Sequence, residues 1–235
     1  MFKIALTAGH FRHTAGKRCM KNLDPNETGE WVLNSRIAEK VETLLGGYEG
    51  YSLLRTDDRA GEKAITIEER VAAANAFGAD IYISIHHNAG IAGGSGGGIV
   101  AYTYTKVSEK TKVWQKELYE ALIKHTSLKG NRATPLASSN LYECRATKMP
   151  AVLLELGFMD SKTDVPVILT EDYANKCAAA IVEVIVKKAG LKEKPQNNKI
   201  YRVQVGSFEK RQNAENLAAE LKSKGYSTII KEEAK

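Results

Sequence analysis

Short apolar runs alternate with amphipathic segments through the first 189 residues of the chain. The apolar runs are bounded by glycine, proline or polar residues, which is typical of buried strands. The predicted strands are 2–7, 51–55, 80–86, 99–104 and 151–156. The predicted helices are 30–45, 66–77, 112–125 and 171–189. This alternation predicts an α/β domain with a twisted, mainly parallel sheet and helices on both faces.

The composition and the hydrophobic pattern of the chain change after residue 189. Residues 190–198 are short, polar and contain a proline, so we expect a linker there. In the segment 199–235 that follows, two predicted strands flank a helix, at 201–205, 227–231 and 213–224. This small C-terminal β-α-β unit has about 35 residues, below the size at which a single core usually suffices. We therefore expect it to depend on a second copy, on the main domain or on a partner chain.

The composition is that of a globular protein with a basic surface. Of the 235 residues, 43% are hydrophobic and 26% are charged, and the net charge is +6. A basic surface favours a polyanionic partner, which leaves nucleic acid, an acidic membrane surface and an anionic cell wall open. Lysine and arginine do not cluster with aromatic residues along one predicted face, so we expect no nucleic acid partner.

The sequence was also searched for a signal peptide, a membrane span and paired cysteines. Only a five-residue apolar run precedes Gly9 and His10, which is too short for the apolar region of a signal peptide. No stretch of the sequence has the length of a membrane span. We therefore expect synthesis in the cytoplasm, so that any action outside it requires release by cell lysis or a holin. Cys19, Cys144 and Cys177 form no CxxC pair, which argues against a disulfide framework and a thiolate zinc site.

Three residues with metal-binding side chains lie near one predicted edge of the sheet. His10 follows the first strand, His86 ends the strand at 80–86, and Glu30 opens the first helix. Ligands of open parallel sheets bind beyond the carboxyl ends of the strands, so these side chains can converge. Two imidazoles, one carboxylate and an open position for water make a hydrolytic zinc site. Each residue also has a structural interpretation, and Glu27 is a rival to Glu30.

Glu155 stands inside the apolar run 151–158. A carboxylate in such a run is costly to bury unless it has a partner or a function. One interpretation is a general base that takes a proton from a metal-activated water and passes it to a leaving amine. The alternative is a structural ion pair with an arginine such as Arg145.

Six sequence blocks occur in an order that resembles a known enzyme family. They are LTAGH at 6–10, Glu30 four residues before Asn34, RTDDR at 55–59, RVAAAN at 70–75, SIHHNA at 84–89 and MPAVLLELGFMD at 149–160. Over roughly residues 1–189 the chain resembles the zinc-dependent N-acetylmuramoyl-L-alanine amidases, the type-3 amidase family. The resemblance implies a twisted sheet flanked by helices. It also implies hydrolysis of the amide bond between N-acetylmuramic acid and L-alanine in peptidoglycan.

The resemblance also implies roles for individual residues. His10, Glu30 and His86 fall on the ligands of one zinc ion, and Glu155 falls on the catalytic glutamate. The loop FRHTAGKR after the first histidine departs from the family's frequent GG-x-DPG sequence, which changes the expected loop shape and substrate contacts.

Further polar residues near the expected site are candidates for substrate contact or for support of the ligands. They are Arg145, Asn88 and His87. We expect His13 and His87 not to bind the metal, because three protein ligands leave the open position that catalysis needs.

The segment 199–235 resembles one half of a sporulation-related (SPOR) repeat, a module associated with peptidoglycan binding. A whole module of this kind has two β-α-β halves, and only the first is recognisable here. The chain is thus predicted to be a wall-lytic amidase, either a mother-cell autolysin or a phage endolysin. The alternatives are a catalytically inactive peptidoglycan-binding protein and a hydrolase of another amide or peptide. The sequence leaves the oligomeric state open.

Overall fold

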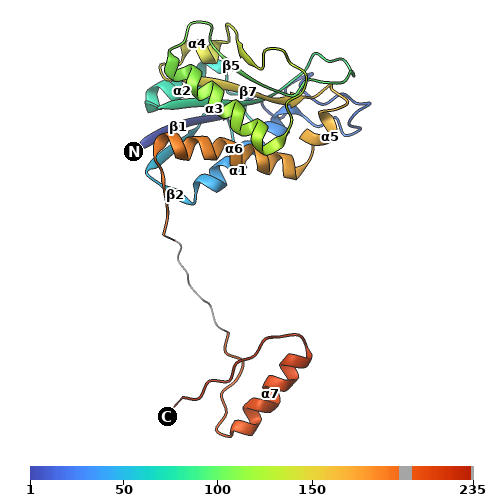
Figure 1. Ribbon diagram of the computed structural model, residues 1–235, viewed down its shortest axis with the longest axis vertical. Helices are drawn as coiled ribbons and strands as arrows, with labels where there is room; N and C mark the ends of the chain where they lie inside the picture. Colours follow the sequence, from blue (N-terminus) through green and yellow to red (C-terminus); the bar gives the residue numbers. More distant parts are fainter. Residues whose placement is uncertain (196–202, 234–235) are drawn as a thin grey trace. The chain divides into compact units, whose positions relative to one another are not determined.

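The computed structural model describes residues 1–195 and 203–233 and divides into two units (Figure 1). The first comprises Met1–Lys194 and the second Pro195–Lys235. The first unit extends beyond residue 189 because β8 (Lys192–Glu193) pairs antiparallel with β2 (Tyr48–Glu49) in a two-stranded sheet. The start of the expected linker is therefore part of the large unit, and residues 196–198 lie outside the described residues.

A six-stranded sheet forms the centre of the large unit and confirms the expected α/β class. Its strands are β1 (Phe2–Ala8), β3 (Tyr51–Arg55), β4 (Ile81–Asn88), β5 (Ile99–Thr103), β6 (Leu136–Ser138) and β7 (Ala151–Phe158). Their order is β3-β1-β4-β7-β5-β6, and all neighbours are parallel except β5 and β7. The central strands β4 and β7 are buried along most of their length, as expected for a sheet covered on both faces.

Helices cover both faces of this sheet (Figure 1). They are α1 (Glu30–Leu45), α2 (Ile67–Phe77), α3 (Glu109–Thr126), α4 (Tyr142–Ala146), α5 (Val165–Ile168) and α6 (Glu171–Ala189). The short helices α4 and α5 were not predicted, because four or five residues carry too little periodicity. Within residues 1–195 and 203–233, none of the helices combines the length and hydropathy that crossing a bilayer requires.

The two faces of the sheet bury different sets of side chains. Ile83 and Ile85 of β4 pack in the larger core with α1, α3 and α6. Tyr82 packs in a smaller core with residues of α2 and α4. Because successive strand residues point to opposite faces, His86 lies on the same face as Tyr82. The same reasoning places Glu155 of β7 on that face, since Leu153 belongs to the smaller core.

In the C-terminal unit the expected helix is present as α7 (Arg211–Ser223). The expected strands are not: segments 203–208 and 226–233 have no strand assignment, and residues 201–202 lie outside the described part of the chain. Val203 is 88% exposed and Ile229 is 89% exposed. An alternating apolar pattern forms a strand only when a neighbouring strand pairs with its backbone and a core covers its apolar side chains. Within the described residues, these segments have neither a neighbouring strand to pair with nor a core that covers their apolar side chains.

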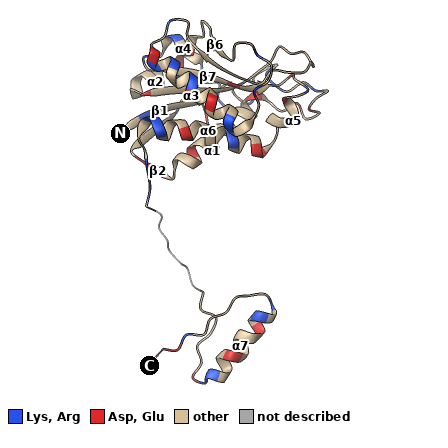
Figure 2. Ribbon diagram, viewed as in Figure 1, with Lys and Arg blue, Asp and Glu red and all other residues tan. Residues whose placement is uncertain are grey.

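Oppositely charged side chains pair along α7 and at Lys224, the residue that follows it. Arg211 Nε lies 2.9 Å from Glu215 Oε1, and Lys224 Nζ lies 2.6 Å from Glu220 Oε1. Figure 2 shows that positions of both charge signs occur along this helix. Pairs at this spacing give an isolated helix some local support. No residue of α7 is fully buried, although several of its residues are half-buried.

Candidate metal centre

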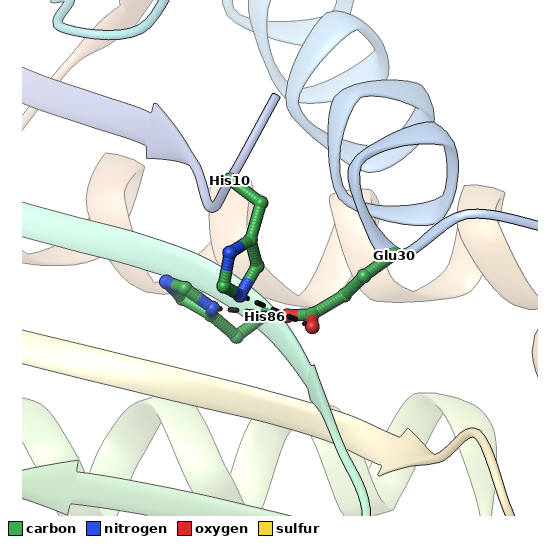
Figure 3. Close-up of side chains that lie close together, drawn as sticks. All are labelled: His10, Glu30 and His86. Carbon is green, nitrogen blue, oxygen red and sulfur yellow. Dashed lines mark hydrogen bonds and ion pairs between the residues drawn. The ribbon is translucent and has the colours of Figure 1, made fainter. Parts of the chain in front are cut away.

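Three side chains converge where β1 and β4 end and α1 begins (Figure 3). His10 Nε2 lies 3.1 Å from Glu30 Oε2, and His86 Nδ1 lies 3.0 Å from Glu30 Oε1. One potential ligand atom from each residue lies within 4.8 Å of the other two. Figure 3 shows both imidazoles directed at the carboxylate. The structure therefore brings together the three residues that the sequence singled out.

The backbone at His10 is held by a buried arginine. His10 has a φ of 66°, in the left-handed region that residues other than glycine rarely adopt. Arg70 of α2 donates hydrogen bonds to the carbonyls of His10 at 2.6 Å and Ala8 at 2.7 Å, and to Thr7 Oγ1 at 2.9 Å. It also donates to the carbonyl of Ile65 at 3.0 Å. These charge-assisted bonds fix the turn that directs His10 toward Glu30.

Glu30 is 1% exposed and is held from several sides. Its Oε1 accepts hydrogen bonds from the backbone N–H of His87 at 3.2 Å and from Asn34 Nδ2 at 3.4 Å. Burial disfavours the charged carboxylate, but the imidazoles of His10 and His86 outweigh burial and lower the pKa of Glu30 well below its ordinary value. The carboxylate is therefore ionised, as a metal ligand must be.

His86 lies between the backbone of Gly9 and a second carboxylate. A Cβ at Gly9 would lie 2.1 to 2.4 Å from three ring atoms of His86, so only glycine permits this approach. Nδ1 of His86 faces Glu30, whereas Nε2 lies 3.5 Å from Glu143 Oε1. Burial disfavours the imidazolium, but Glu143 and Glu30 together outweigh it and raise the pKa of His86 to about 10. Metal binding at an imidazole displaces its proton, so the negative charge that stabilises the imidazolium would also favour a cation bound to this ring.

Glu155 lies beside His86 on the neighbouring strand. The register of β4 and β7 pairs these two residues directly. Glu155, Glu30 and His86 line one cavity of about 260 Å³. Burial raises the pKa of Glu155 to about 7 against the opposing influence of His86, and its Oε2 has no hydrogen-bond partner among the described residues. A carboxyl group with these properties, facing a cavity, is suited to accept and return a proton.

The donor set fits a catalytic zinc ion. Glu30 Oε2 is buried without an aligned hydrogen bond, although His10 Nε2 lies 3.1 Å away. A buried carboxylate oxygen left in this way is costly, and a cation bound between these atoms would satisfy it. Within the described residues the converging group includes only His10, Glu30 and His86. Two imidazoles and one carboxylate leave a fourth position for water, as in catalytic zinc sites.

Two other candidate ligands lie outside this group. Glu27 pairs with Arg18 at 3.7 Å and with Lys21 at 3.6 Å. The side chain of His13 is 63% exposed, and its Nε2 lies 3.3 Å from Glu62 Oε2. Both side chains therefore have partners of their own in the loop region.

His87 and Asn88 follow His86 but face different surroundings. His87 alternates to the opposite face of β4, where its Nδ1 lies 2.8 Å from Asn34 Oδ1. Burial lowers the pKa of His87 to about 3, so this imidazole is neutral. Its Nε2 has no hydrogen-bond partner among the described residues, and both His87 and Asn88 contribute to the lining of the cavity.

Arg145 lies at the end of α4. It donates a hydrogen bond to Asn140 and its guanidinium stacks on Tyr142, 5.4 Å from the ring centre. No ion pair joins it to Glu155 in the part of the chain that the structure describes. Arg145 is therefore held by its immediate sequence neighbours.

Three residues that shape the site were not identified from the sequence. They are Gly9, Arg70 and Glu143. Arg70 entered the sequence analysis only as the first residue of the block at 70–75, and Glu143 stands in a helix too short to predict. A polar residue inside an apolar run is the signal that pointed to Glu155, whereas Arg70 directly follows Glu68 and Glu69 and carries no such signal.

The chain matches two known family models. Residues 4–187 match the model described as N-acetylmuramoyl-L-alanine amidase, and residues 197–235 match that of the SPOR domain. The sporulation-specific N-acetylmuramoyl-L-alanine amidase of Bacillus subtilis is 31% identical over 235 residues, covering 98% of this chain and 84% of that protein. The endolysin of Bacillus phage SPP1 is 32% identical over 192 residues, covering 81% of this chain and 67% of that protein.

Solved structures share the fold of the large unit. The catalytic domain of CwlV, an N-acetylmuramoyl-L-alanine amidase from Bacillus (Paenibacillus) polymyxa var. colistinus, has a TM-score of 0.71 at 23% identity, covering 82% of this chain and 100% of that chain. The N-acetylmuramoyl-L-alanine amidase of Clostridium difficile 630 has a TM-score of 0.70 at 22% identity, covering 80% and 97%. At these identities the likeness shows the fold.

Proposed function

The chain belongs to the N-acetylmuramoyl-L-alanine amidase family, and from this premise we propose that His10, Glu30 and His86 bind one zinc ion and that Glu155 transfers the protons of the reaction. The enzyme is an amidase acting on peptidoglycan, with a SPOR domain, which binds peptidoglycan, at residues 197–235. The observation that carries the proposal is the convergence of three ligand atoms within 4.8 Å beside a cavity that Glu155 also lines.

The proposed reaction is hydrolysis of the amide between N-acetylmuramic acid and L-alanine. A zinc ion at the three ligands supplies Lewis-acid activation of a water molecule and of the amide carbonyl. Glu155 then accepts a proton from the water as its oxygen bonds to the carbonyl carbon, and delivers it to the nitrogen as the carbon–nitrogen bond breaks. The products are a carboxylate on the muramic acid and a free amino group on L-alanine.

The remaining residues of the site keep these groups in place. Glu30 is fixed by the backbone N–H of His87 and by Asn34, and His10 is fixed through its carbonyl by Arg70. The apolar surroundings of Glu155 keep its carboxyl group near the pKa at which a proton is readily taken up and given back. The site is thus preorganised before substrate arrives.

For the biological role, we propose wall lysis by an autolysin of a sporulating cell. The match to the SPOR model and the alignment of nearly the whole chain with a sporulation-specific relative favour this role over that of a phage endolysin. Deletion of the gene in its host is expected to delay release of spores from the mother cell. Release on the normal schedule would contradict the autolysin role and leave the chemistry untouched.

Metal analysis combined with a wall-digestion assay tests the chemistry. We expect about one zinc per chain in the purified protein, and loss of zinc and of activity in His10→Ala and His86→Ala. His13→Ala is the matched control, because this exposed imidazole stands three residues from His10 and pairs with Glu62. Activity is measured as new L-alanine amino termini released from purified walls. Unchanged zinc content in the first two variants would overturn the ligand assignment.

A further inference from the structure

Glu143 is a buried carboxylate that the chemistry above does not use. It is 7% exposed and lies in α4, which packs against β7 and α2. Its Oε1 lies 3.5 Å from His86 Nε2, and its Oε2 accepts a hydrogen bond from the Tyr82 hydroxyl at 2.9 Å. A carboxylate taken out of water is costly unless both of its oxygens find partners. These two contacts supply them.

The geometry of β4 places Tyr82 and His86 where one carboxylate can contact both. Tyr82 and His86 are four residues apart on β4, so their side chains stand on the same face of the sheet. Glu143 reaches that face from α4 and spans the two side chains. A rigid central strand therefore fixes the distance between the hydroxyl and the imidazole that the carboxylate joins.

The two ring nitrogens of His86 face different acids. Nδ1 lies 3.0 Å from Oε1 of Glu30, a member of the converging group, whereas Nε2 faces Glu143. A histidine that binds a metal through one nitrogen becomes a stronger and better oriented ligand when its other N–H is donated to a carboxylate. The ring also lies against Gly9, so its plane is restricted from a second direction.

We propose that Glu143 is a positioning residue of the metal centre, which accepts the Nε2–H of His86 and thereby makes Nδ1 the ligand nitrogen. Tyr82 supports Glu143 by donating to its other oxygen. This inference rests on the proposed role of His86 as a zinc ligand. Glu143 stays outside the converging group, so it acts on the metal only through the imidazole.

Zinc affinity of the full-length chain tests this role. The protein is stripped with a chelator, and its affinity is measured by competition with a chromophoric chelator. Glu143→Gln is expected to bind zinc about 10- to 100-fold more weakly than the unsubstituted chain. Asp164→Asn is the matched control, since Asp164 is also buried but accepts hydrogen bonds from the backbone of Gly98 and Phe158. Its zinc affinity is expected to be unchanged.

A double variant distinguishes positioning of His86 by Glu143 from a general structural role of Glu143. In His86→Ala, whose residual affinity is measured at raised zinc concentration, the further change Glu143→Gln is expected to cause no additional loss of zinc affinity, because the route through the imidazole is gone. Nitrogen NMR of the zinc-loaded chain is expected to show His86 protonated at Nε2. If Glu143→Gln does not fold, Tyr82→Phe removes only the supporting hydroxyl and is expected to weaken zinc binding several-fold.

Two results would overturn the inference. One is a Glu143→Gln variant that binds zinc as tightly as the unsubstituted chain. The other is an equal loss of affinity with and without the His86 imidazole, which would mark a structural role. Either result leaves the proposed function standing if the unsubstituted chain binds one zinc and cuts peptidoglycan. An unsubstituted chain that binds no zinc would instead remove the proposed zinc chemistry itself.

Discussion

The two units of the chain differ in what they bury. Helix α1 of the large unit buries nine residues, including the ligand candidate Glu30, whereas α7 of the C-terminal unit buries none. The central strands that carry His86 and Glu155 are buried over most of their length. In the described C-terminal segments, Val203 and Ile229 are almost fully exposed.

This difference separates two ways of contributing to function. Catalysis requires side chains held within about half an ångström of a productive geometry, which a densely packed core provides. Binding to a polymer surface does not require such precision, because a segment can become ordered as it makes its contacts. We therefore expect substitutions in the large unit to act on chemistry, metal affinity or stability, and changes in the C-terminal unit to act on wall binding.

The largest effect is expected for Glu155→Gln. The amide cannot take the proton of the attacking water, so release of new L-alanine amino termini from purified walls should fall about 10²- to 10⁴-fold. Zinc content and melting temperature should stay close to those of the unsubstituted protein, since the side chain keeps its shape. Glu183→Gln, on the exposed surface of α6, is the matched control. Activity in Glu155→Gln equal to that of the control would remove Glu155 from the reaction.

Glu155 also illustrates what the sequence reveals by itself. A lone carboxylate inside an apolar strand is a local anomaly that is recognisable in the sequence alone. The alternation that predicted the longer strands and helices of the large unit is recognisable in the same way. The positions of His10 and His86 followed from a general rule about the carboxyl ends of parallel strands. The first two features depend on patterns between near neighbours in the sequence, and the third depends on the topology of a parallel sheet.

The features that were missed depend on contacts between distant residues. Tyr82 and Glu143 are 61 residues apart in sequence, and Arg70 reaches a carbonyl 60 residues away. No periodicity encodes such pairs, and the helix that carries Glu143 is too short to have a pattern. The C-terminal strands were predicted from alternation alone, which cannot report whether a neighbouring strand is present.

A large loss of stability is expected for Arg70→Ala. The change leaves the carbonyls of Ala8, His10 and Ile65 without their buried donor, which should cost about 2–4 kcal/mol in the free energy of unfolding. Urea denaturation of the zinc-free protein measures it. Arg145→Ala is the matched control because that arginine contacts its sequence neighbours Asn140 and Tyr142, and it should lose less than about 1 kcal/mol. Equal losses of unfolding free energy in the two variants would show that the buried hydrogen bonds of Arg70 contribute no extra stability.

A smaller effect is expected for Gly9→Ala. The new Cβ would lie 2.1 Å from the nearest ring atom of His86, so the ring or the strand end must move. Such overpacking should destabilise the protein by about 1–3 kcal/mol and should also weaken zinc binding. Gly29→Ala has its nearest neighbouring atom at 3.8 Å and serves as the control. Wild-type zinc affinity in Gly9→Ala would show that the position of the His86 ring is not set by this contact.

The smallest effect on chemistry is expected when residues 195–235 are removed. The buried core of the large unit includes no residue beyond Leu191, so the shortened chain should fold and turn over soluble muramyl-peptide fragments within about twofold of the full chain. Retention on purified walls should fall, and more so at raised salt, where the remaining electrostatic attraction is screened. The measurements are turnover of the soluble fragment and the bound fraction on walls. Loss of soluble turnover would mean that catalysis needs both units, and retention equal to that of the full chain would mean that the large unit alone recognises the wall.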